Sequence, residues 1–354
     1  MSATTTKNSQ SSEKGRSGYL GSQVNTRLDV ERYSTSPPLP KKIGIEINNS
    51  CNHKCYFCQN PTMTRPRRVM DGQMVRRVLR EAYDAGIRHA SFYSGGEPFL
   101  NRDLPGYVYE AKKLGFEYVY LSTNGGKVVS DRLMPVLNAG VDSVKFSINA
   151  GDRETYSIVH GHDEFEHVMR NLEFVARHRA ETGSPKRLFV SCVETPINRS
   201  SIEALKARVG PIVDEVVIYP FVVIGTPLKK RIERDGTERP FIGYEDTDKL
   251  DEWNRKRLKL PCYQLWSYLN VTVEGYLSAC CSDYNNDLVV GNLHNSSLLE
   301  AWSSPEFQEL RLRHLNGNID GTLCEGCILQ KDRTYLPINP ALKTRETSAR
   351  TTVP

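Results

Sequence analysis

Cysteines are the residues of this sequence whose spacing most clearly predicts chemistry. Eight of the nine fall into two groups: Cys51, Cys55 and Cys58, and then Cys262, Cys280, Cys281, Cys324 and Cys327. Thiolates bind zinc and iron–sulfur clusters, and thiols also form disulfides. An odd count, in a chain whose N-terminus lacks the apolar core of a secretion signal, argues against a disulfide framework. The two groups therefore predict two metal centres.

The first group has the pattern C-x3-C-x2-C and directly follows an expected strand. Three thiolates on one loop can hold three irons of a 4Fe–4S cube and leave the fourth iron open. Zinc is the rival metal, but a structural zinc site takes four ligands. His53, between Cys51 and Cys55, is cramped for a fourth contact from the same turn. The spacing favours an open iron–sulfur cluster over zinc and over three unrelated cysteines.

The second group has five cysteines and can supply four thiolates from a strand, a hairpin and a terminal C-x2-C pair. Four thiolates close equally well around zinc or around a 4Fe–4S cube, so spacing alone leaves both metals open. One cysteine of the five is then surplus, and its simplest interpretation is a buried thiol or an alternative ligand. The isolated Cys192 lies in an expected strand and is predicted to pack in the core as a small apolar side chain.

The elements that must position these groups alternate regularly along the chain. Strands are expected at 43–47, 90–93, 118–122, 143–148, 188–193 and 216–222, with helices at 72–85, 104–114, 131–139, 165–179 and 201–209. Such alternation predicts an α/β fold with a parallel sheet and outer helices, either open or curved into a barrel. In both cases a ligand is expected at the carboxyl ends of the strands.

The flanking segments divide the chain further. Residues 1–40 are predicted to be a disordered tail, 41–225 the α/β core, 226–260 a charged connecting segment, 261–335 a small cysteine-bearing domain and 336–354 a second tail. Within these, 229–240 is expected to be an exposed irregular loop. A hairpin is expected at 269–280 around Glu274-Gly275, and one amphipathic helix at 297–314.

Bulk composition excludes several classes of function. A net charge of +5 over 354 residues gives no case for nucleic-acid binding, and no apolar run is long enough for a membrane span. Apolar residues make up 38% of the chain and charged residues 25%, as in ordinary soluble proteins. A cytoplasmic protein without nucleic-acid or membrane partners is therefore expected.

The cysteine loop, with Phe57 before its third cysteine, resembles the signature of the radical S-adenosylmethionine (SAM) superfamily. That resemblance implies a partial (β/α)6 TIM-like barrel in which SAM binds the open iron and yields a 5′-deoxyadenosyl radical. Further positions at strand ends resemble cofactor-binding residues of the family: Gly95, Gly96, Glu97, Thr123, Asn124, Ser147 and Asn149. The resemblance implies that Glu97 accepts from the methionine ammonium group of SAM. Ordinary turn and loop roles remain open for these polar residues.

The second cysteine group resembles the SPASM/twitch appendage of radical SAM enzymes. Gly275, the Cys280-Cys281 doublet and Gly291-Asn292-Leu293 carry this likeness. The absence of cysteines after Cys327 points to the shorter twitch version with one auxiliary 4Fe–4S cluster. The resemblance implies that Cys262, Cys280, Cys324 and Cys327 are its ligands, in a closed cluster suited to electron transfer.

The pattern further resembles antibiotic-pathway dehydrogenases and epimerases that act on aminocyclitols and sugars. This implies abstraction of hydrogen from a carbinol C–H bond, with a flavodoxin-type protein as electron donor. Dehydrogenation is slightly favoured because a closed cluster can accept an electron, whereas epimerisation would use Cys281 as hydrogen donor. A maturase of ribosomally made peptides is the alternative enzyme. A zinc or iron–sulfur scaffold would need only closed sites, and the first group leaves one position open. The sequence singles out no general base.

Overall fold

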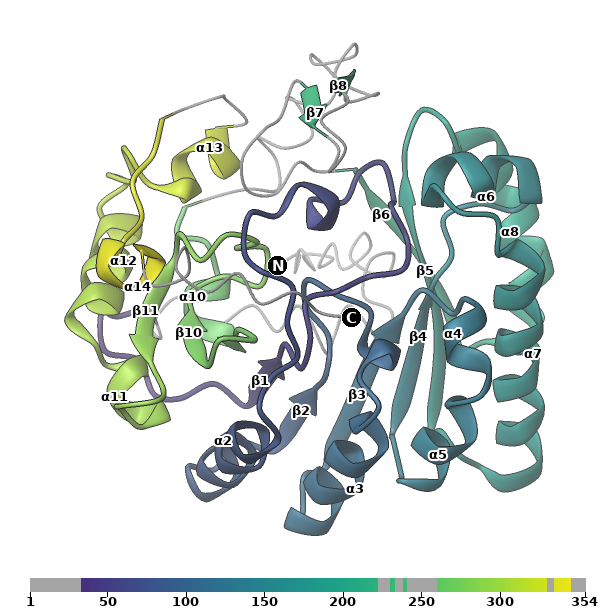
Figure 1. The fold of residues 1–354 in the computed structure, drawn as a ribbon, viewed down its shortest axis with the longest axis horizontal. Helices are drawn as coiled ribbons and strands as arrows, with labels where there is room; N and C mark the ends of the chain where they lie inside the picture. The colour runs from purple at the N-terminus through teal and green to yellow at the C-terminus, as the bar shows by residue number, and fades with distance from the viewer. Residues whose placement is uncertain (1–32, 222–229, 233–237, 241–259, 330–333, 345–354) are drawn as a thin grey trace, which may run out of the picture.

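The computed structural model describes residues 33–221, 230–232, 238–240, 260–329 and 334–344 (Figure 1). Within these residues the main feature is a nine-stranded sheet in the order β11-β10-β9-β1-β2-β3-β4-β5-β6. Its strands are β1 Lys42–Ile45, β2 His89–Ser91, β3 Tyr118–Thr123, β4 Ser143–Ser147, β5 Arg187–Glu194, β6 Glu215–Pro220, β9 Leu269–Val271, β10 Tyr276–Ser278 and β11 Val289–Asn292. Strands β1 to β6 pair in parallel in sequence order. The predicted α/β fold with a parallel sheet is therefore confirmed.

Helices connect the parallel strands and cover the outer side of the curved sheet (Figure 1). They are α2 Gly72–Asp84, α3 Leu104–Leu114, α4 Lys127–Ser130, α5 Leu133–Asn138, α6 Arg153–His160, α7 Phe165–Thr182 and α8 Ile202–Val209, with short 3-10 turns η2 Asn60–Thr62, η3 Pro98–Leu100, η4 Arg199–Ser201 and η5 Gly210–Ile212. Local signals fix their ends. Asp71 caps α2 by accepting from the backbone of Gln73 and Met74, and α3 stops at Gly115, whose φ is 103°.

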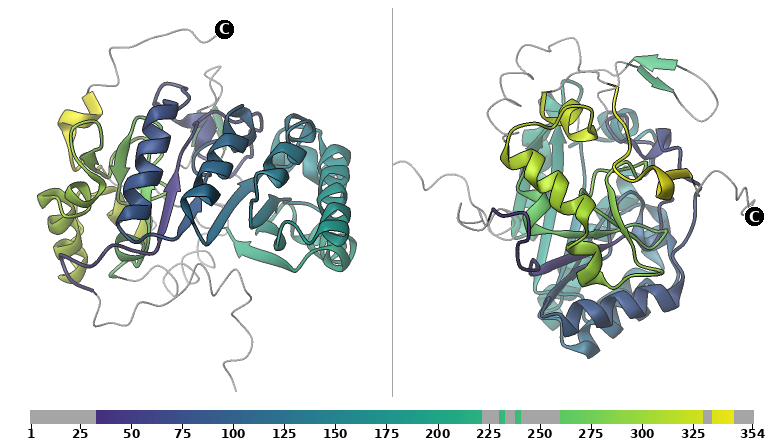
Figure 2. Two further views of the ribbon diagram at one scale, coloured as in Figure 1. Left: turned by 90° about the horizontal axis from the view of Figure 1, so that it is seen from below. Right: turned by 90° about the vertical axis from the view of Figure 1, so that its left-hand side faces the viewer.

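The C-terminal domain extends the same sheet. Strand β9 pairs in parallel with β1, placing Ile43 beside Leu269, and the predicted hairpin of β9 and β10 is present. Its helices are α10 Gln264–Ser267, α11 Leu298–Trp302, α12 Pro305–Leu315, α13 Leu323–Leu329 and α14 Pro340–Thr344. Seen from below, this domain lies at one end of the molecule and α7 at the other, with α2 and α3 between them (Figure 2). The two cysteine groups are thus carried by one continuous sheet.

Two sequence predictions of secondary structure are wrong. The single helix expected at 297–314 is two helices, because Ser304 caps a new helix at Pro305, which has no backbone N–H to continue the first. The segment 229–240, expected to be irregular, contains an antiparallel pair, β7 Lys230–Ile232 with β8 Glu238–Pro240. Residues 233–237 between them lie outside the described residues, as does most of the expected connecting segment.

Parts of both predicted tails pack against the C-terminal domain. Residues 1–32 and 345–354 lie outside the described residues, but 33–40 pack against the C-terminal domain. There the indole N–H groups of Trp266 and Trp302 donate to the carbonyls of Ser34 and Pro37, at 2.7 and 2.9 Å. Leu342, in α14, is buried in a small cluster with Tyr276 and Val289. Apolar and aromatic side chains thus hold in place two segments, 33–40 and α14, that composition alone predicts to be parts of polar tails.

The alternation of buried and part-exposed residues shows which face of the sheet is available to a ligand. In β3, Tyr118, Tyr120 and Ser122 are partly exposed while the residues between them are buried. In β4, Lys145 and Ser147 are the part-exposed residues. The buried face packs under the outer helices, so the other face lines the concave side of the sheet. Among the described helices, none has the length and apolar character needed to cross a lipid bilayer.

Packing between β11 and α11 gives a test of this arrangement. A Cβ atom at Gly291 would lie 2.4 Å from the Cβ of Ala301, whereas one at Gly210 would meet no atom within 4 Å. We expect Gly291→Ala to lower the free energy of unfolding by about 1–3 kcal/mol through overpacking. The control Gly210→Ala, at a helical φ of −52°, should change it by less than about 1 kcal/mol. Urea denaturation of both variants checks this, and equal stabilities would contradict the predicted contact.

Candidate active site

The loop that follows β1 presents three thiols, and each has a polar side-chain neighbour. Asn124 Nδ2 lies 3.9 Å from Cys51 Sγ, and His160 Nδ1 lies 3.5 Å from Cys55 Sγ. The hydroxyl of Tyr284, in the C-terminal domain, lies 3.8 Å from Cys58 Sγ. Hydrogen bonds to cysteine sulfur are one of the means by which proteins tune iron–sulfur clusters.

The cysteines are free thiols and do not form the close triangle of a single zinc site. All nine cysteines are described, and none forms a disulfide. Zinc–sulfur bonds of about 2.3 Å place tetrahedral ligands about 3.8 Å apart. Among the described residues, no three cysteine sulfurs lie within 4.8 Å of one another. The assignment of each cysteine to a cluster stays a prediction.

His53 and His160 form a buried chain beside the first group. His53 Nε2 lies 3.0 Å from Glu164 Oε2, and the two Nδ1 atoms face each other at 3.3 Å. Nε2 of His160 contacts the amide of Asn149 at 3.2 Å. His53, Cys55 and His160 are close enough to hold a metal ion, but hydrogen bonds already account for the ring nitrogens. Burial lowers the pKa of both histidines, so the chain supports the cysteine loop as neutral imidazoles.

Gly95, Gly96 and Glu97 lie directly against the cysteine loop. A Cβ atom at Gly96 would lie 2.5 Å from the carbonyl oxygen of Ser50, so only glycine allows this approach. The buried carboxylate of Glu97 accepts from the hydroxyl of Thr123 at 2.8 Å and the backbone N–H of Asn124 at 2.7 Å. Burial raises the pKa of Glu97 to about 7. Glu97 thus joins the second and third strand ends, and its contact with SAM stays a prediction.

The other predicted cofactor residues also lie at strand ends. Thr123 and Asn124 share Glu97, and Asn124 also donates to Asn52 at 2.8 Å. The hydroxyls of Ser147 and Ser122 are 3.3 Å apart on neighbouring strands. Asn149 accepts from the backbone of Val193 at 2.7 Å. Strands β2 to β4 therefore bring these residues to one edge, as parallel pairing requires, while their roles toward SAM stay predictions.

The second cysteine group gathers four buried or half-buried thiols. Burial raises the pKa of Cys262 to about 12, and the nearby Cys327 and Cys281 contribute. The pKa of Cys324 is also raised, by burial first and then by Cys262 and Cys327. Cys280 interacts with Cys262 as well. These four thiols converge from α10, the β10 hairpin and α13, as a closed cluster requires.

Cys281 interacts with the second group and also with residues of the barrel. A hydrogen bond with Cys280 lowers the pKa of the Cys281 thiol, and the positive charge of Lys145 contributes. The charge of Cys281 in turn raises the pKa of Tyr93 and of Tyr120, although burial is the larger cause for both. Cys281 therefore lies near residues of the barrel as well as near the second group.

Those barrel residues form a tyrosine cluster around Lys145 on the concave face of the sheet. Lys145 Nζ lies 5.8 Å from the ring centre of Tyr93 and 5.7 Å from that of Tyr219. The Tyr268 hydroxyl is 3.1 Å from that of Tyr120 and 2.5 Å from the hydroxyl of Ser91. Residues following β2 and on β6, far apart in the sheet, meet over Lys145 only if the sheet curves around it. Burial lowers the pKa of Lys145 to about 8.

The tyrosine cluster was not predicted from the sequence, although a signal was present. Tyr118, Tyr120 and Ser122 alternate with apolar residues in β3, and Lys145 interrupts an apolar strand. A polar side chain in the middle of a strand otherwise built for the core marks a face turned to a cavity. His160, the last residue of α6, is buried behind Cys55.

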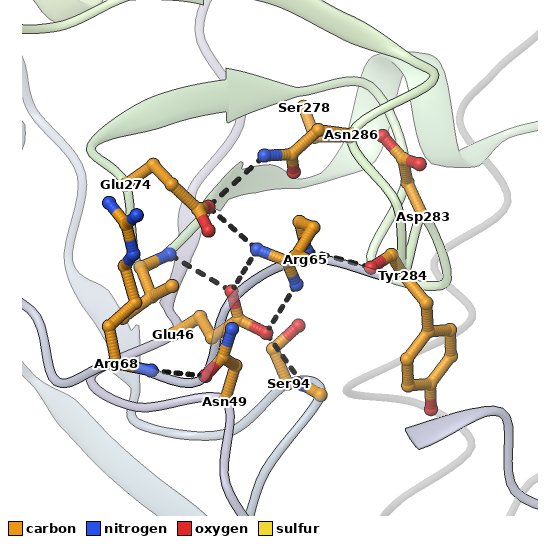
Figure 3. Close-up of polar contacts among 12 residues, drawn as sticks. Glu46, Asn49, Arg65, Arg68, Ser94, Glu274, Ser278, Asp283, Tyr284 and Asn286 are labelled. Atoms are coloured by element: carbon orange, nitrogen blue, oxygen red, sulfur yellow. Dashed lines mark hydrogen bonds and ion pairs between the residues drawn. The ribbon is translucent and has the colours of Figure 1, made fainter. Parts of the chain in front are cut away.

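A buried ion network joins the two domains beneath the site (Figure 3). Arg65 donates to both carboxylate oxygens of Glu46 at 3.0 Å and to Glu274 at 2.6 Å. Burial alone would lower the pKa of Arg65, but Glu46 and Glu274 outweigh it and raise the pKa. Glu46 also accepts from the backbone N–H groups of Gly95 and Val273, at 3.2 and 2.9 Å. One carboxylate thus touches three segments that carry the site.

Two protein families match this chain. The radical SAM superfamily matches residues 45–185, and the iron–sulfur cluster-binding SPASM domain matches residues 262–328. The two domains imply two 4Fe–4S clusters. The predicted radical SAM core and cysteine-rich C-terminal domain are therefore confirmed.

Curated relatives match only part of the chain. A probable GTP 3′,8-cyclase of Saccharolobus solfataricus is 30% identical over 131 residues, which are 37% of this chain and 42% of that protein. The PqqA peptide cyclase of Xanthomonas axonopodis pv. citri is 34% identical over 151 residues, 42% of this chain and 38% of the relative. The matches thus span about two fifths of the length of these relatives.

Solved structures share the fold. BtrN in complex with AdoMet and 2-DOIA gives a TM-score of 0.51 at 18% identity, over 84% of this chain and 97% of BtrN. Streptococcus suis SuiB bound to S-adenosylmethionine gives 0.60 at 14% identity, over 85% of this chain and 73% of SuiB. The native anSMEcpe with bound AdoMet gives 0.59 at 15% identity, over 86% and 95%.

Iron analysis tests the assignment of the two cysteine groups. We expect about eight irons in the anaerobically reconstituted protein and about four after replacement of Cys51, Cys55 and Cys58 by alanine. Cys281→Ala should keep about eight, because Cys281 is assigned no iron. About four irons in the unaltered protein, or zinc in the second group, would contradict two clusters.

The ion network predicts an unequal response to substitution. Arg65→Met leaves Glu46 and Glu274 facing each other without a cation, so we expect a loss of about 3–5 kcal/mol in unfolding free energy. Glu274→Gln leaves a neutral Arg65–Glu46 pair of similar shape and should cost clearly less. Chemical denaturation of the two variants measures the order, and a reversed order would contradict a shared dependence on Arg65.

Proposed function

This chain is a radical SAM enzyme with a C-terminal SPASM domain, and from that premise we propose that it inverts a carbinol carbon of a sugar or aminocyclitol. Cys51, Cys55 and Cys58 would hold the SAM-binding cluster, and Cys262, Cys280, Cys324 and Cys327 the auxiliary one. When bound, SAM and its cluster supply a 5′-deoxyadenosyl radical that removes a hydrogen atom from the substrate. A low-potential one-electron donor of the flavodoxin type would serve as partner.

The position of Cys281 is the observation that carries this proposal. The Ser94 hydroxyl, after β2 of the barrel, donates to the carbonyl oxygen of Cys281 at 3.4 Å. The Cys281 thiol interacts with Lys145, Tyr93 and Tyr120, as well as with Cys280 and Cys262 of the second group. A thiol beside the substrate can return a hydrogen atom to a substrate radical. The sequence alone slightly favours dehydrogenation, because Cys281 had a simpler explanation there. The nearness of Cys281 to Lys145 and the tyrosines supports epimerisation instead.

The proposed reaction replaces one hydrogen atom of the carbinol carbon with another on the opposite face. One hydrogen atom leaves the substrate carbon on one face, and the S–H hydrogen of Cys281 arrives on the other. The low-potential donor would supply two electrons in each turnover: one for the cleavage of SAM, and one that, with a proton, restores the Cys281 thiol. The carbinol ends with the same atoms and the opposite configuration. The reaction is therefore redox-neutral for the substrate and consumes one SAM in each turnover.

The tyrosines around Lys145 support the proposed substrate class, because their hydroxyls and aromatic faces suit a hydroxylated ring. Lys145 itself is compatible with the competing outcome, dehydrogenation. Dehydrogenation would require a group that accepts the hydroxyl proton, and a lysine whose pKa is near 8 can do so in its neutral form. Product analysis therefore decides between inversion and oxidation at one site.

A deuterium experiment tests the proposal with a panel of hexoses, aminocyclitols and 2-DOIA, the compound named with the structural neighbour BtrN. We expect deuterium from one carbinol position to enter 5′-deoxyadenosine, and an inverted product that gains deuterium from D₂O through the exchangeable thiol. Cys281→Ala should still transfer deuterium to 5′-deoxyadenosine but form no inverted product. The control Cys192→Ala, at a buried core thiol, should retain inversion.

Other products would redirect the assignment. A ketone from the unaltered enzyme would replace epimerisation by dehydrogenation. Deuterium transfer from a peptide and from none of the small molecules would favour the maturase alternative. The identity with the PqqA peptide cyclase is the observation that keeps this second candidate.

A further inference from the structure

Tyr284 reaches from one cysteine group to the other. It follows the Cys280-Cys281 doublet by three residues, yet its hydroxyl lies 3.8 Å from Cys58 Sγ, 226 positions earlier in the chain. The side chains beside Cys51 and Cys55, Asn124 and His160, both belong to the barrel. Tyr284 therefore brings a contact from the C-terminal domain to the loop proposed to hold the SAM-binding cluster.

Several contacts fix Tyr284 in this position (Figure 3). Arg65 Nε donates to the carbonyl oxygen of Tyr284 at 2.7 Å, and the remaining nitrogens of Arg65 are engaged with Glu46 and Glu274. The next residue, Asn285, accepts from the backbone N–H and hydroxyl of Thr64 at 2.9 and 3.0 Å. The loop bearing Tyr284 is thus fastened to the segment that directly follows the first cysteine group.

The Tyr284 ring also covers the second motif of the barrel. A Cβ atom at Gly95 would lie 3.7 Å from this ring. The ring is therefore held next to Gly95 while its hydroxyl faces Cys58. This packing limits where the hydroxyl can point.

A phenol is protonated at neutral pH, so its hydroxyl donates to a nearby thiolate. Reduction adds an electron and makes a cluster and its cysteine sulfurs more negative. A hydrogen-bond donor at such a sulfur stabilises the reduced form and raises the reduction potential. Loss of the hydroxyl should have the opposite effect.

We propose that Tyr284 is a positioning residue through which the C-terminal domain makes the SAM-binding cluster easier to reduce, by donating a hydrogen bond to Cys58. The SAM-binding cluster would then reach its working potential only with the second domain docked against the barrel. This inference needs no particular substrate and goes beyond the proposed function. It would stand even if the carbinol substrate were wrong.

Redox titration followed by electron paramagnetic resonance tests it. The signal of the first cluster is identified by its change on addition of SAM. In Tyr284→Phe we expect about eight irons, as in the unaltered protein, and a more negative midpoint potential for the first cluster. The matched control is Tyr263→Phe. The pKa of Tyr263 is raised by burial and by Cys281, Cys262 and Cys280, which places it at the second group. This control should leave the first potential unchanged.

A second variant covers the case in which Tyr284→Phe fails to fold or load iron. Fluorination of the ring of Tyr284 at carbon 3 keeps its shape and its hydroxyl, still largely protonated at pH 7, but makes it a stronger donor. We expect this substitution to move the first potential in the positive direction. An unchanged first potential in a loaded variant would overturn the proposal. So would an equal shift in Tyr263→Phe, which would indicate a general effect of lost hydroxyls.

Discussion

Arg65 is the cation on which the arrangement of the site depends. Its side chain and those of Glu46 and Glu274 are each only 2% exposed. Charges buried this deeply are costly unless each has a partner and further hydrogen bonds. Here the partners of Arg65 are two carboxylates, Glu46 and Glu274, which lie 19 and 209 positions away in the chain. The two domains can therefore satisfy these charges only when they are docked together.

The sheet makes that docking specific. Strand β9 pairs with β1 through backbone hydrogen bonds, so the C-terminal domain is joined to the barrel by register as well as by charge. Glu46 follows β1 and accepts from Val273, just after β9. A shift of one residue would turn the side chains of β9 to the opposite face and misplace the ion network. Register and charge thus specify the same interface.

The sequence predicts most of the barrel because its signals are local. Alternating apolar runs and the three cysteines within eight residues each act over one element. Arg65, Glu46 and Glu274 carry no such signal, since isolated charged residues resemble ordinary surface residues. The packing of 33–40 and of α14 also has no local signal in the sequence. Their anchors, Trp266 and Trp302 for the first segment and Tyr276 for the second, lie far away in the chain.

Cys281 shows where chain spacing stops being informative. The sequence places it beside Cys280, and only the fold shows what else lies nearby. Its thiol interacts with Cys262 of the second group and also with Lys145 of the barrel. Because β9 and the ion network fix the hairpin to β1, the Cys281 thiol is held beside the tyrosines around Lys145. A hydrogen donor fixed in this way can reach one face of a bound ring, which is the geometric condition for inverting a single carbon.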